Sequence, residues 1–325
     1  MSPRDVAFRP AVPTTGGPSG RQYEIAWGDQ RVVVVEVGGG LRAYSAMGRQ
    51  LLDGYRAEEM CSAGRGQLLM PWPNRVQDGR YEFAGRQHQL ALTEPERGNA
   101  IHGLVRWAAW TVGDHEPDRV VMHHELRPQP GYPFSLSLEV EYSLSEDGLR
   151  VRTTAQNVGP DPCPFGGGAH PYLTVGTALV DDIVLRAPGR TVLRTDGRGI
   201  PTGTEPVEGT EYDFRRPRPI GPTRLDQCFT DLERDEDGLA RVELRHPQDD
   251  TGLTLWTDQS HAHLMLFTGD PLPQINRRSL AVEPMTCPPD ALRSGVGLIT
   301  LGPGMSCACE WGISPQRHNG RWRTS

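Results

Sequence analysis

The sequence predicts an all-β protein built as a large antiparallel β-sandwich, and three observations support this fold class. Apolar and polar residues alternate strictly in many short stretches of the 325-residue chain, as is typical of half-buried strands. Turn signals that combine an acid with glycine separate these stretches, for example Asp147-Gly148 and Asp237-Gly238. No stretch of about 12 residues has a convincing helical period. Many short strands with few helices favour a sandwich or a barrel.

The clearest single element is a hairpin between residues 134 and 155. Apolar residues occupy every second position from Phe134 to Leu144, the Asp147-Gly148 turn follows, and the alternation resumes at Leu149 and Val151. The same pattern predicts further strands around residues 242–244, 253–255, 264–266, 280–282 and 307–313. A short turn of helix is expected near residues 289–293.

No linker divides the chain, so we expect one domain over residues 1–325. Residues 197–222 are rich in Gly, Pro and Thr and are predicted to form a long surface loop. The first 20 residues or so and residues 315–325, which include a basic cluster, are expected to be frayed ends.

Charge and composition narrow the range of partners and compartments. The net charge of -7 argues against nucleic-acid binding, which requires a basic surface to neutralise phosphates. The longest apolar run, Val32 to Val35, is far too short to cross a bilayer, and residues 1–25 contain no apolar signal segment. The six cysteines form no CxxC pair, so we expect them to be reduced. These features predict a cytoplasmic protein without a membrane partner.

Two glycine runs resemble nucleotide-binding loops only superficially. Residues 38–40 and 166–168 are each Gly-Gly-Gly, but neither has the GxGxxG spacing followed by a helix. We therefore expect tight turns and close backbone contacts at both places.

Polar residues in two segments are candidates for binding a ligand. In Pro71-Trp72-Pro73-Asn74-Arg75, two prolines stiffen the chain and place Asn74 and Arg75 beside an aromatic ring, a combination that suits a sugar. The alternative to ligand binding is that Arg75 only holds a loop in place. His102 precedes Gly103, which leaves its ring open to a ligand, and Trp107 follows closely; a hydrogen-bonded structural histidine is the alternative.

Two other segments offer groups that could transfer protons. His170 follows three glycines and precedes Pro171-Tyr172, and its ordinary pKa near neutrality suits a general acid. Glu283 ends an alternating strand where Pro284 interrupts the ladder, and apolar neighbours there would raise its pKa and suit a general base. Asp226 lies between apolar neighbours, where it would hold a sugar hydroxyl or cap a turn.

The order of these segments along the chain resembles the aldose 1-epimerase (galactose mutarotase) family. The resemblance runs from Asn74 to Ala291 and includes Glu-Pro-x-Thr at residues 283–286. It implies a galactose mutarotase-like supersandwich that binds a small-molecule sugar and uses no cofactor and no metal. It also implies roles for the candidate residues: His170 as general acid, Glu283 as general base, and Arg75, His102 and Asp226 as substrate-holding residues. From their segments, Asn74, Trp107 and Tyr172 are further binding candidates.

The chain departs from the common family pattern at two places. Gly103-Leu104-Val105-Arg106-Trp107 replaces a Gly-Gly-x-x-Gly-Phe run, and Pro171-Tyr172 follows the second histidine in place of Thr-Tyr-Phe. These departures indicate a divergent bacterial branch whose sugar the sequence does not name.

The predicted reaction is the interconversion of the α and β anomers of a free aldose by a monomer or homodimer. It requires His170 and Glu283 to face each other across a sugar-sized gap. Three alternatives remain open from the sequence. The same fold could act on an anionic hexose, such as a hexose 6-phosphate or a sulfonated sugar, with Arg75 and Arg106 pairing with the anion. The chain could instead be a non-catalytic carbohydrate-binding protein, or His102, His170 and Glu283 could hold a metal ion.

Overall fold

The computed structural model describes residues 17–248 and 251–317, and within these ranges almost all regular structure is antiparallel β-sheet. The prediction of an all-β fold is confirmed. Helical structure in the described ranges is limited to the α-helix α1 (Ala291–Ser294) and two 3-10 helices, η2 (Pro95–Arg97) and η3 (Val180–Asp182). The expected helical turn near residues 289–293 is thus present as α1. None of these helices is long or apolar enough to cross a membrane.

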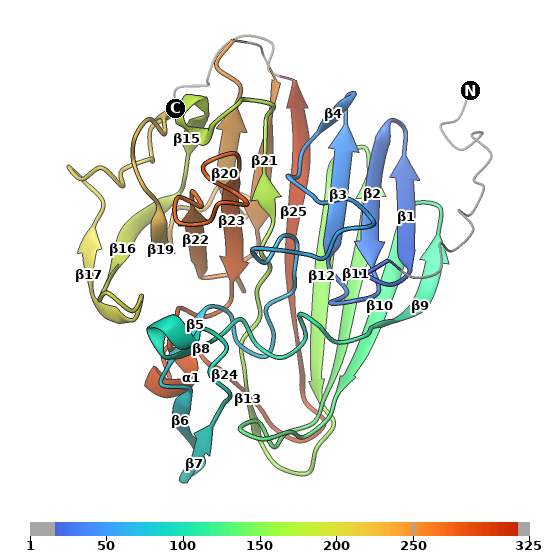
Figure 1. Cartoon of the computed structure of the whole chain (residues 1–325), viewed down its shortest axis with the longest axis vertical. Coiled ribbons are helices and arrows are strands. Elements are labelled where there is room, and N and C mark those ends of the chain that lie inside the picture. Colours follow the sequence, from blue (N-terminus) through green and yellow to red (C-terminus); the bar gives the residue numbers. More distant parts are fainter. Residues whose placement is uncertain (1–16, 249–250, 318–325) are drawn as a thin grey trace.

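A nine-stranded sheet forms the centre of the molecule (Figure 1). The predicted hairpin is confirmed as β11 (Leu136–Ser145) and β12 (Gly148–Asn157), in which Leu136 pairs with Asn157 and Ser145 with Gly148. In spatial order the strands are β18 (Arg218–Pro219), β15 (Val184–Arg186), β20 (Ala240–Arg245), β21 (Thr251–Thr257), β25 (Ser306–Arg317), β12 (Gly148–Asn157), β11 (Leu136–Ser145), β10 (Arg119–Leu126) and β9 (Thr111–Glu116).

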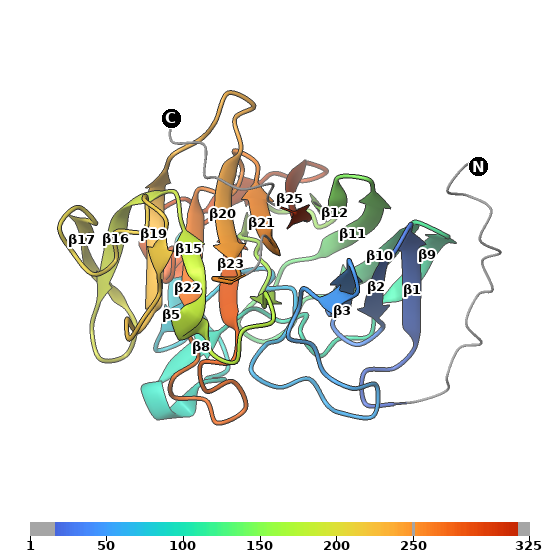
Figure 2. The same ribbon diagram turned by 90° about the horizontal axis from the view of Figure 1, so that it is seen from above.

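Two smaller sheets lie towards opposite ends of the central sheet, as Figure 2 shows from above. The four-stranded sheet lies beside β9 to β12 and consists of β1 (Gln22–Trp27), β2 (Gln30–Val35), β3 (Leu41–Ala46) and β4 (Arg49–Gln50). The six-stranded sheet lies beside β15 and β20 and has the order β14 (Tyr172–Leu173), β23 (Leu280–Met285), β22 (His263–Phe267), β19 (Asp226–Leu232), β16 (Gly189–Thr195) and β17 (Pro201–Pro206).

Three two-stranded ribbons complete the described strands, and in Figure 1 they lie below β22 and β23. They are β5 (Arg75–Gln77) with β8 (Asn99–Ile101), β6 (Arg80–Phe83) with β7 (Arg86–Gln89), and β13 (Cys163–Phe165) with β24 (Ile299–Leu301).

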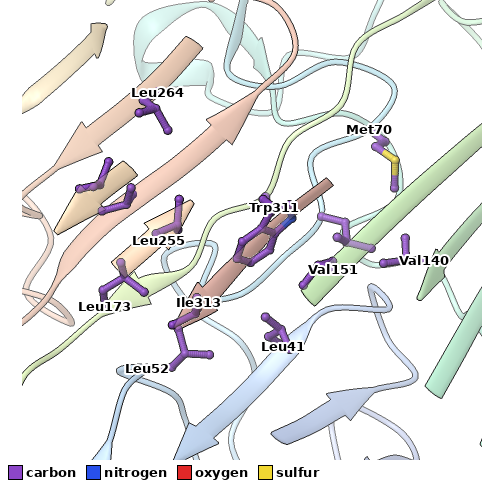
Figure 3. Packing of buried hydrophobic residues seen from close by; sticks show 14 of the residues in the cluster. Leu41, Leu52, Met70, Val140, Val151, Leu173, Leu255, Leu264, Trp311 and Ile313 are labelled. Atoms are coloured by element: carbon purple, nitrogen blue, oxygen red, sulfur yellow. The ribbon is translucent and has the colours of Figure 1, made fainter. Parts of the chain in front are cut away.

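One large apolar core joins the sheets, and its alternating residues come from strands far apart in the sequence. Trp311 and Ile313 on β25 lie at its centre, between Val140 and Val151 of the β11–β12 hairpin and Leu255 on β21 (Figure 3). Because successive strand residues point to opposite faces, period-2 alternation gives each strand one buried face. Burying such side chains contributes about 1.5–3 kcal/mol each, so packing of these faces is the main stabilising term.

The structure refines three expectations about loops and ends. Residues 197–222 are not simply a loop, because β17 and β18 form within them and Phe214 and Ile220 are buried. Residues 17–20 and 315–317 are structured rather than frayed, since Gly17 bridges to Gly20 and β25 continues to Arg317. Short stretches of β-pairing give the backbone N–H and C=O groups of these segments hydrogen-bond partners, which their composition did not predict. The remaining predicted ends, residues 1–16 and 318–325, lie outside the described residues.

The glycine runs and cysteines behave as predicted. A Cβ at Gly39 would lie 2.7 Å from the Trp110 ring, and one at Gly166 would lie 2.4 Å from Cys287 Sγ, so both runs mark close contacts. All six cysteines are free.

Candidate active site

The predicted site residues come from five separate places in the fold. Asn74 and Arg75 lie at the start of β5, and His102 follows its partner strand β8. His170 lies between β13 and β14, Asp226 begins β19, and Glu283 lies inside β23.

The β5–β8 ribbon holds Asn74 and His102 against each other. The Asn74 backbone N–H donates to His102 Nδ1 at 3.2 Å, and the His102 backbone N–H donates to the Asn74 carbonyl at 2.9 Å. Both residues have left-handed backbone angles, with φ of 55° and 63°, in a region that non-glycine residues rarely occupy. Strained backbone of this kind persists where surrounding contacts enforce it and is frequent at functional sites. Since Nδ1 accepts this bond, Nε2 of a neutral His102 carries the proton.

Arg75 is fixed by a carboxylate that the sequence did not single out. Its Nε and Nη2 donate to the two carboxylate oxygens of Glu94 at 2.9 and 3.0 Å, while Asn99 Nδ2 donates to the same carboxylate at 3.0 Å. Burial alone would lower the pKa of Arg75, but Glu94, Asp226 and Glu283 together raise it. The bidentate pair therefore sets the orientation of a buried guanidinium.

His170 is held by its backbone and by stacking. Its N–H donates to the Gln67 carbonyl at 3.0 Å, and its ring stacks on Tyr172 with centroids 4.9 Å apart. Gly64 packs directly on the ring, because a Cβ there would lie 3.0 Å from Cδ2 of His170. The His102 ring meets the same imidazole edge-on at 5.4 Å. The imidazole thus has little freedom to turn.

Strand register places Glu283 and Asp226 on one face of the six-stranded sheet. Glu283 pairs with Met265, which pairs with Cys228, and Asp226 lies two residues before Cys228. Directly paired residues share a face, as do residues two apart in a strand. The two carboxylates consequently influence each other, and the Asp226 charge helps to raise the pKa of Glu283.

The two candidate proton-transfer groups meet at the centre of the site. His170 Nε2 lies 3.2 Å from Glu283 Oε1, and the two residues are only 4% and 2% exposed. The sequence predicted that they face each other across a sugar-sized gap, whereas here they touch, because two buried polar groups are stabilised by pairing. His170 Nδ1, Glu283 Oε2 and the Tyr172 hydroxyl are buried without a hydrogen-bond partner among the described residues. A buried site with unsatisfied polar atoms is suited to a polar ligand.

Burial shifts the proton affinities of this pair in opposite directions. It lowers the pKa of His170 to about 3, with a smaller contribution from the Arg106 charge, and raises that of Glu283 well above its ordinary value. The expected neutral-range imidazolium is therefore not the resting form. The pair instead shares one proton, which burial favours on Glu283. Burial and neighbouring cationic groups likewise keep the pKa of His102 well below its ordinary value, so this ring is neutral.

The same three side chains also have the composition of a metal site. One ligand atom from each of His102, His170 and Glu283 lies within 4.8 Å of the others. Two imidazoles and one carboxylate can bind a divalent transition metal. The geometry thus keeps the metal alternative open.

The other predicted residues differ in how they relate to this centre. Tyr172 is buried against His170, and Asn74 supports His102, as described above. Trp107 is half exposed, one residue after Arg106. Trp72, which the sequence placed as an aromatic surface for the sugar, is buried against Tyr132 and offers no open face.

A hollow of about 430 Å³ nearby is lined by none of the predicted residues; Arg65 and Ser62 are among its walls.

Sequence reasoning missed Glu94 and Gln67. Glu94 lies in a polar, turn-like stretch, and nothing local reveals that it reaches Arg75, 19 residues earlier. Gln67 pairs with the His170 backbone and donates through Nε2 to the Arg106 carbonyl at 3.0 Å. The contacts of Gln67 likewise join segments that are far apart in the sequence.

Comparisons with known proteins agree with this fold. The sequence profile described as Aldose 1-epimerase matches residues 21–313, and the chain belongs to that family. The chain is 34% identical over 300 residues to the uncharacterized protein YihR of Escherichia coli K12, covering 92% of this chain and 94% of YihR. Human galactose mutarotase is 28% identical over 165 residues, which is 48% of this chain and 46% of that protein.

Solved structures confirm the galactose mutarotase-like fold. The GalM/aldose epimerase homologue from C. elegans superposes with a TM-score of 0.82 at 18% identity, covering 92% of this chain and 99% of that one. At this identity the likeness concerns the fold.

Proposed function

We propose that this protein is an aldose 1-epimerase that interconverts the α and β anomers of a free sugar. The observation that carries the proposal is the buried contact between His170 and Glu283, beside the fixed guanidinium of Arg75. Membership of the aldose 1-epimerase family supports it.

The reaction requires two coordinated proton transfers. A cyclic aldose opens when its ring oxygen gains a proton and its C1 hydroxyl loses one, which yields the aldehyde. Rotation about the C1–C2 bond and closure on the other face give the second anomer. His170 delivers the proton to the ring oxygen while Glu283 accepts the proton from the C1 hydroxyl, and closure reverses both transfers. Positioned groups of this kind each contribute about 10²–10⁴-fold in rate.

The resting proton on Glu283 must reach His170 before this step. The 3.2 Å between Oε1 and Nε2 is short enough for a direct transfer, which creates the carboxylate and imidazolium forms together. The nearby Arg75 charge favours the carboxylate, because it lowers the pKa of Glu283. The pair keeps one proton throughout, so the chemistry consumes no group of the protein.

The neighbouring polar groups hold the sugar. Arg75 keeps Nη1 outside its Glu94 pair, and Asp226 is partly exposed at the edge of the same cluster. Guanidinium and carboxylate groups together bind the donor and acceptor sides of sugar hydroxyls. His102, neutral and supported by Asn74, offers a further N–H.

A non-catalytic sugar-binding protein is the competing function. Such a protein has no use for a desolvated carboxyl group in contact with an imidazole, because burying both groups without a reaction only costs stability. The buried pair therefore favours an enzyme.

The test is to follow anomer exchange directly. Freshly dissolved α-anomers of a panel of aldoses should lose their excess optical rotation faster with the protein than without it. We expect catalysis for at least one aldose, at a rate proportional to protein concentration. Unchanged rotation kinetics across the whole panel, alongside measurable sugar binding, would establish the binding protein instead.

A further inference from the structure

Arg106 is a partly buried cation beside the catalytic pair, and it lacks a counter-charge. Its guanidinium makes no ion pair within 4.0 Å and no hydrogen bond with any part of the chain in residues 17–248 and 251–317. Neighbouring arginines differ: Arg75 has Glu94 at 2.9 Å, and Arg97 has Asp226 at 3.8 Å. Arg106 is therefore the exception among the arginines around the site.

The backbone fixes Arg106 close to the imidazoles. Gln67 Nε2 donates to the Arg106 carbonyl at 3.0 Å, and the carbonyl of the same Gln67 accepts from the His170 backbone N–H at 3.0 Å. The buried Gln67 thus connects the segment that contains Arg106 to the segment that contains His170. In agreement with this placement, the Arg106 charge lowers the pKa of both His102 and His170.

No nearby protein group compensates the charge. Burial lowers the pKa of Arg106, and the one group that opposes this shift is Cys61. Burial raises the pKa of that thiol to about 11, so Cys61 is neutral at pH 7. Placing a cation in a partly desolvated position costs free energy unless an anion pairs with it. The missing anion is then expected to come from the ligand.

Arg106 lies on the histidine side of the catalytic pair, because Gln67 joins its carbonyl to the His170 backbone. Its charge acts on both histidines, whereas Asp226 acts on Glu283 and Arg75 acts on both Glu283 and His102. In the proposed reaction Glu283 faces the C1 hydroxyl and His170 faces the ring oxygen. The exocyclic carbon C6 is attached to C5, which is bonded to that ring oxygen, so a group on C6 lies on the His170 side.

We propose that Arg106 binds an anionic group carried on C6 of the sugar, which makes the substrate an anionic hexose. The inference rests on the proposed mutarotase function and names its substrate class. Pairing of the anion with Arg75 is disfavoured, because the Glu94 carboxylate already balances the charge of that guanidinium. The half-exposed Trp107 adjoins Arg106, where an aromatic surface can cover the C–H face of the ring.

The deciding experiment compares sugars with the wild-type protein. Anomer exchange is measured by two-dimensional exchange NMR for glucose, glucose 6-phosphate, glucuronate and glucose bearing a 6-sulfonate, which separates phosphate, carboxylate and sulfonate as the anion. We expect kcat/KM for at least one anionic sugar to exceed that for glucose by about tenfold or more. If glucose is turned over as well as or better than all three, the inference is wrong and the mutarotase function stands. If none of the four is accelerated, the mutarotase function itself fails for this sugar class.

Substitution then assigns the preference to one residue. Arg106→Gln should reduce the ratio of kcat/KM for the best anionic sugar to that for glucose by about tenfold, and Arg106→Lys should retain part of that ratio. Arg127→Gln, at a position whose side chain is 73% exposed, is the matched control and should leave the ratio unchanged. An unaltered ratio in Arg106→Gln, with a melting curve like that of the wild type, would exclude Arg106 as the anion-binding residue.

Discussion

His170 Nε2 lies 3.2 Å from Glu283 Oε1 in a part of the molecule where both side chains are almost fully buried. The contact joins a loop before β14 to the interior of β23, so it exists only in the folded sheet. Burial disfavours charge on each partner separately. Burial therefore favours a neutral imidazole beside a protonated carboxyl group, and in the proposed mechanism this pair acts as acid and base.

Removing either partner should abolish most of the activity without unfolding the protein. We expect Glu283→Gln and His170→Asn each to reduce the rate of mutarotation at least about a hundredfold, since each removes one proton-transfer group. Glu283→Gln should melt at the same temperature as the wild type or higher, because the amide carries no ionisable proton in the buried site. Polarimetry and thermal unfolding provide the two readouts. A near-normal rate in either variant would remove that residue from the mechanism.

The shared proton predicts the alkaline limb of the pH profile. The active pair carries one proton, and it loses that proton as pH rises through the raised pKa of Glu283. Asp226 raises this pKa and Arg75 lowers it. Asp226→Asn should therefore move the alkaline limb of kcat/KM to lower pH, and Arg75→Gln should move it to higher pH. Asp237→Asn, at a position with a 79% exposed side chain, is the control and should leave the limb in place. Shifts in the same direction for both variants would contradict the shared-proton state.

Much of the fold could be predicted from the sequence because period-2 alternation is a local property. The strands β11, β12, β20 and β25 follow directly from it. The pairing of β25 between β21 and β12 does not, since partners so distant in sequence are chosen by packing of the whole core. The strands inside residues 197–222 also escaped prediction, because their turn-rich composition hides short pairings that tertiary contacts stabilise.

The site was partly predictable for a similar reason. His170 and Glu283 stand out locally, one after three glycines and one at a strand interrupted by proline. Their contact, and the support of Arg75 by Glu94, depend on the meeting of separate segments. Trp72 was predicted to face the sugar but is buried, because an aromatic residue that is next to polar residues in the sequence can equally well point into the core.

Loss of the Glu94 carboxylate should leave the Arg75 side chain without the ion pair that fixes its orientation. Glu94→Gln removes the bidentate pair and leaves a buried guanidinium undercompensated, which should lower the free energy of unfolding by about 1–3 kcal/mol. Because Arg75 is proposed to hold the sugar, we expect KM to rise more than kcat falls. The matched control is Glu96→Gln, an exposed position two residues away. A large fall in kcat at unchanged KM would show instead that Glu94 acts on the chemical step.

Metal removal separates the acid–base mechanism from the metal alternative. His102, His170 and Glu283 could hold a divalent cation, but the proposed reaction needs none. We expect extensive dialysis against EDTA to leave the mutarotation rate within about twofold of its starting value, since proton transfer by side chains supplies the catalysis. Added Zn²⁺ should inhibit by occupying the two imidazoles. Loss of activity after dialysis that Zn²⁺ restores would show that the ion is part of the catalyst.

Gly64 and Gly48 offer a matched pair for testing how tightly His170 must be held. Both have left-handed backbone angles, with φ of 76° and 73°, so alanine at either position incurs a similar backbone cost of about 1 kcal/mol. A Cβ at Gly64 would lie 3.0 Å from Cδ2 of His170, whereas one at Gly48 meets nothing within 4 Å. The imidazole must move by a few tenths of an ångström in Gly64→Ala, which should reduce kcat at least about threefold, because acid–base transfer depends on position. Gly48→Ala should lose similar stability and keep its kcat. Equal kcat values for the two variants would show that the imidazole tolerates displacement and that its close packing against Gly64 serves stability alone.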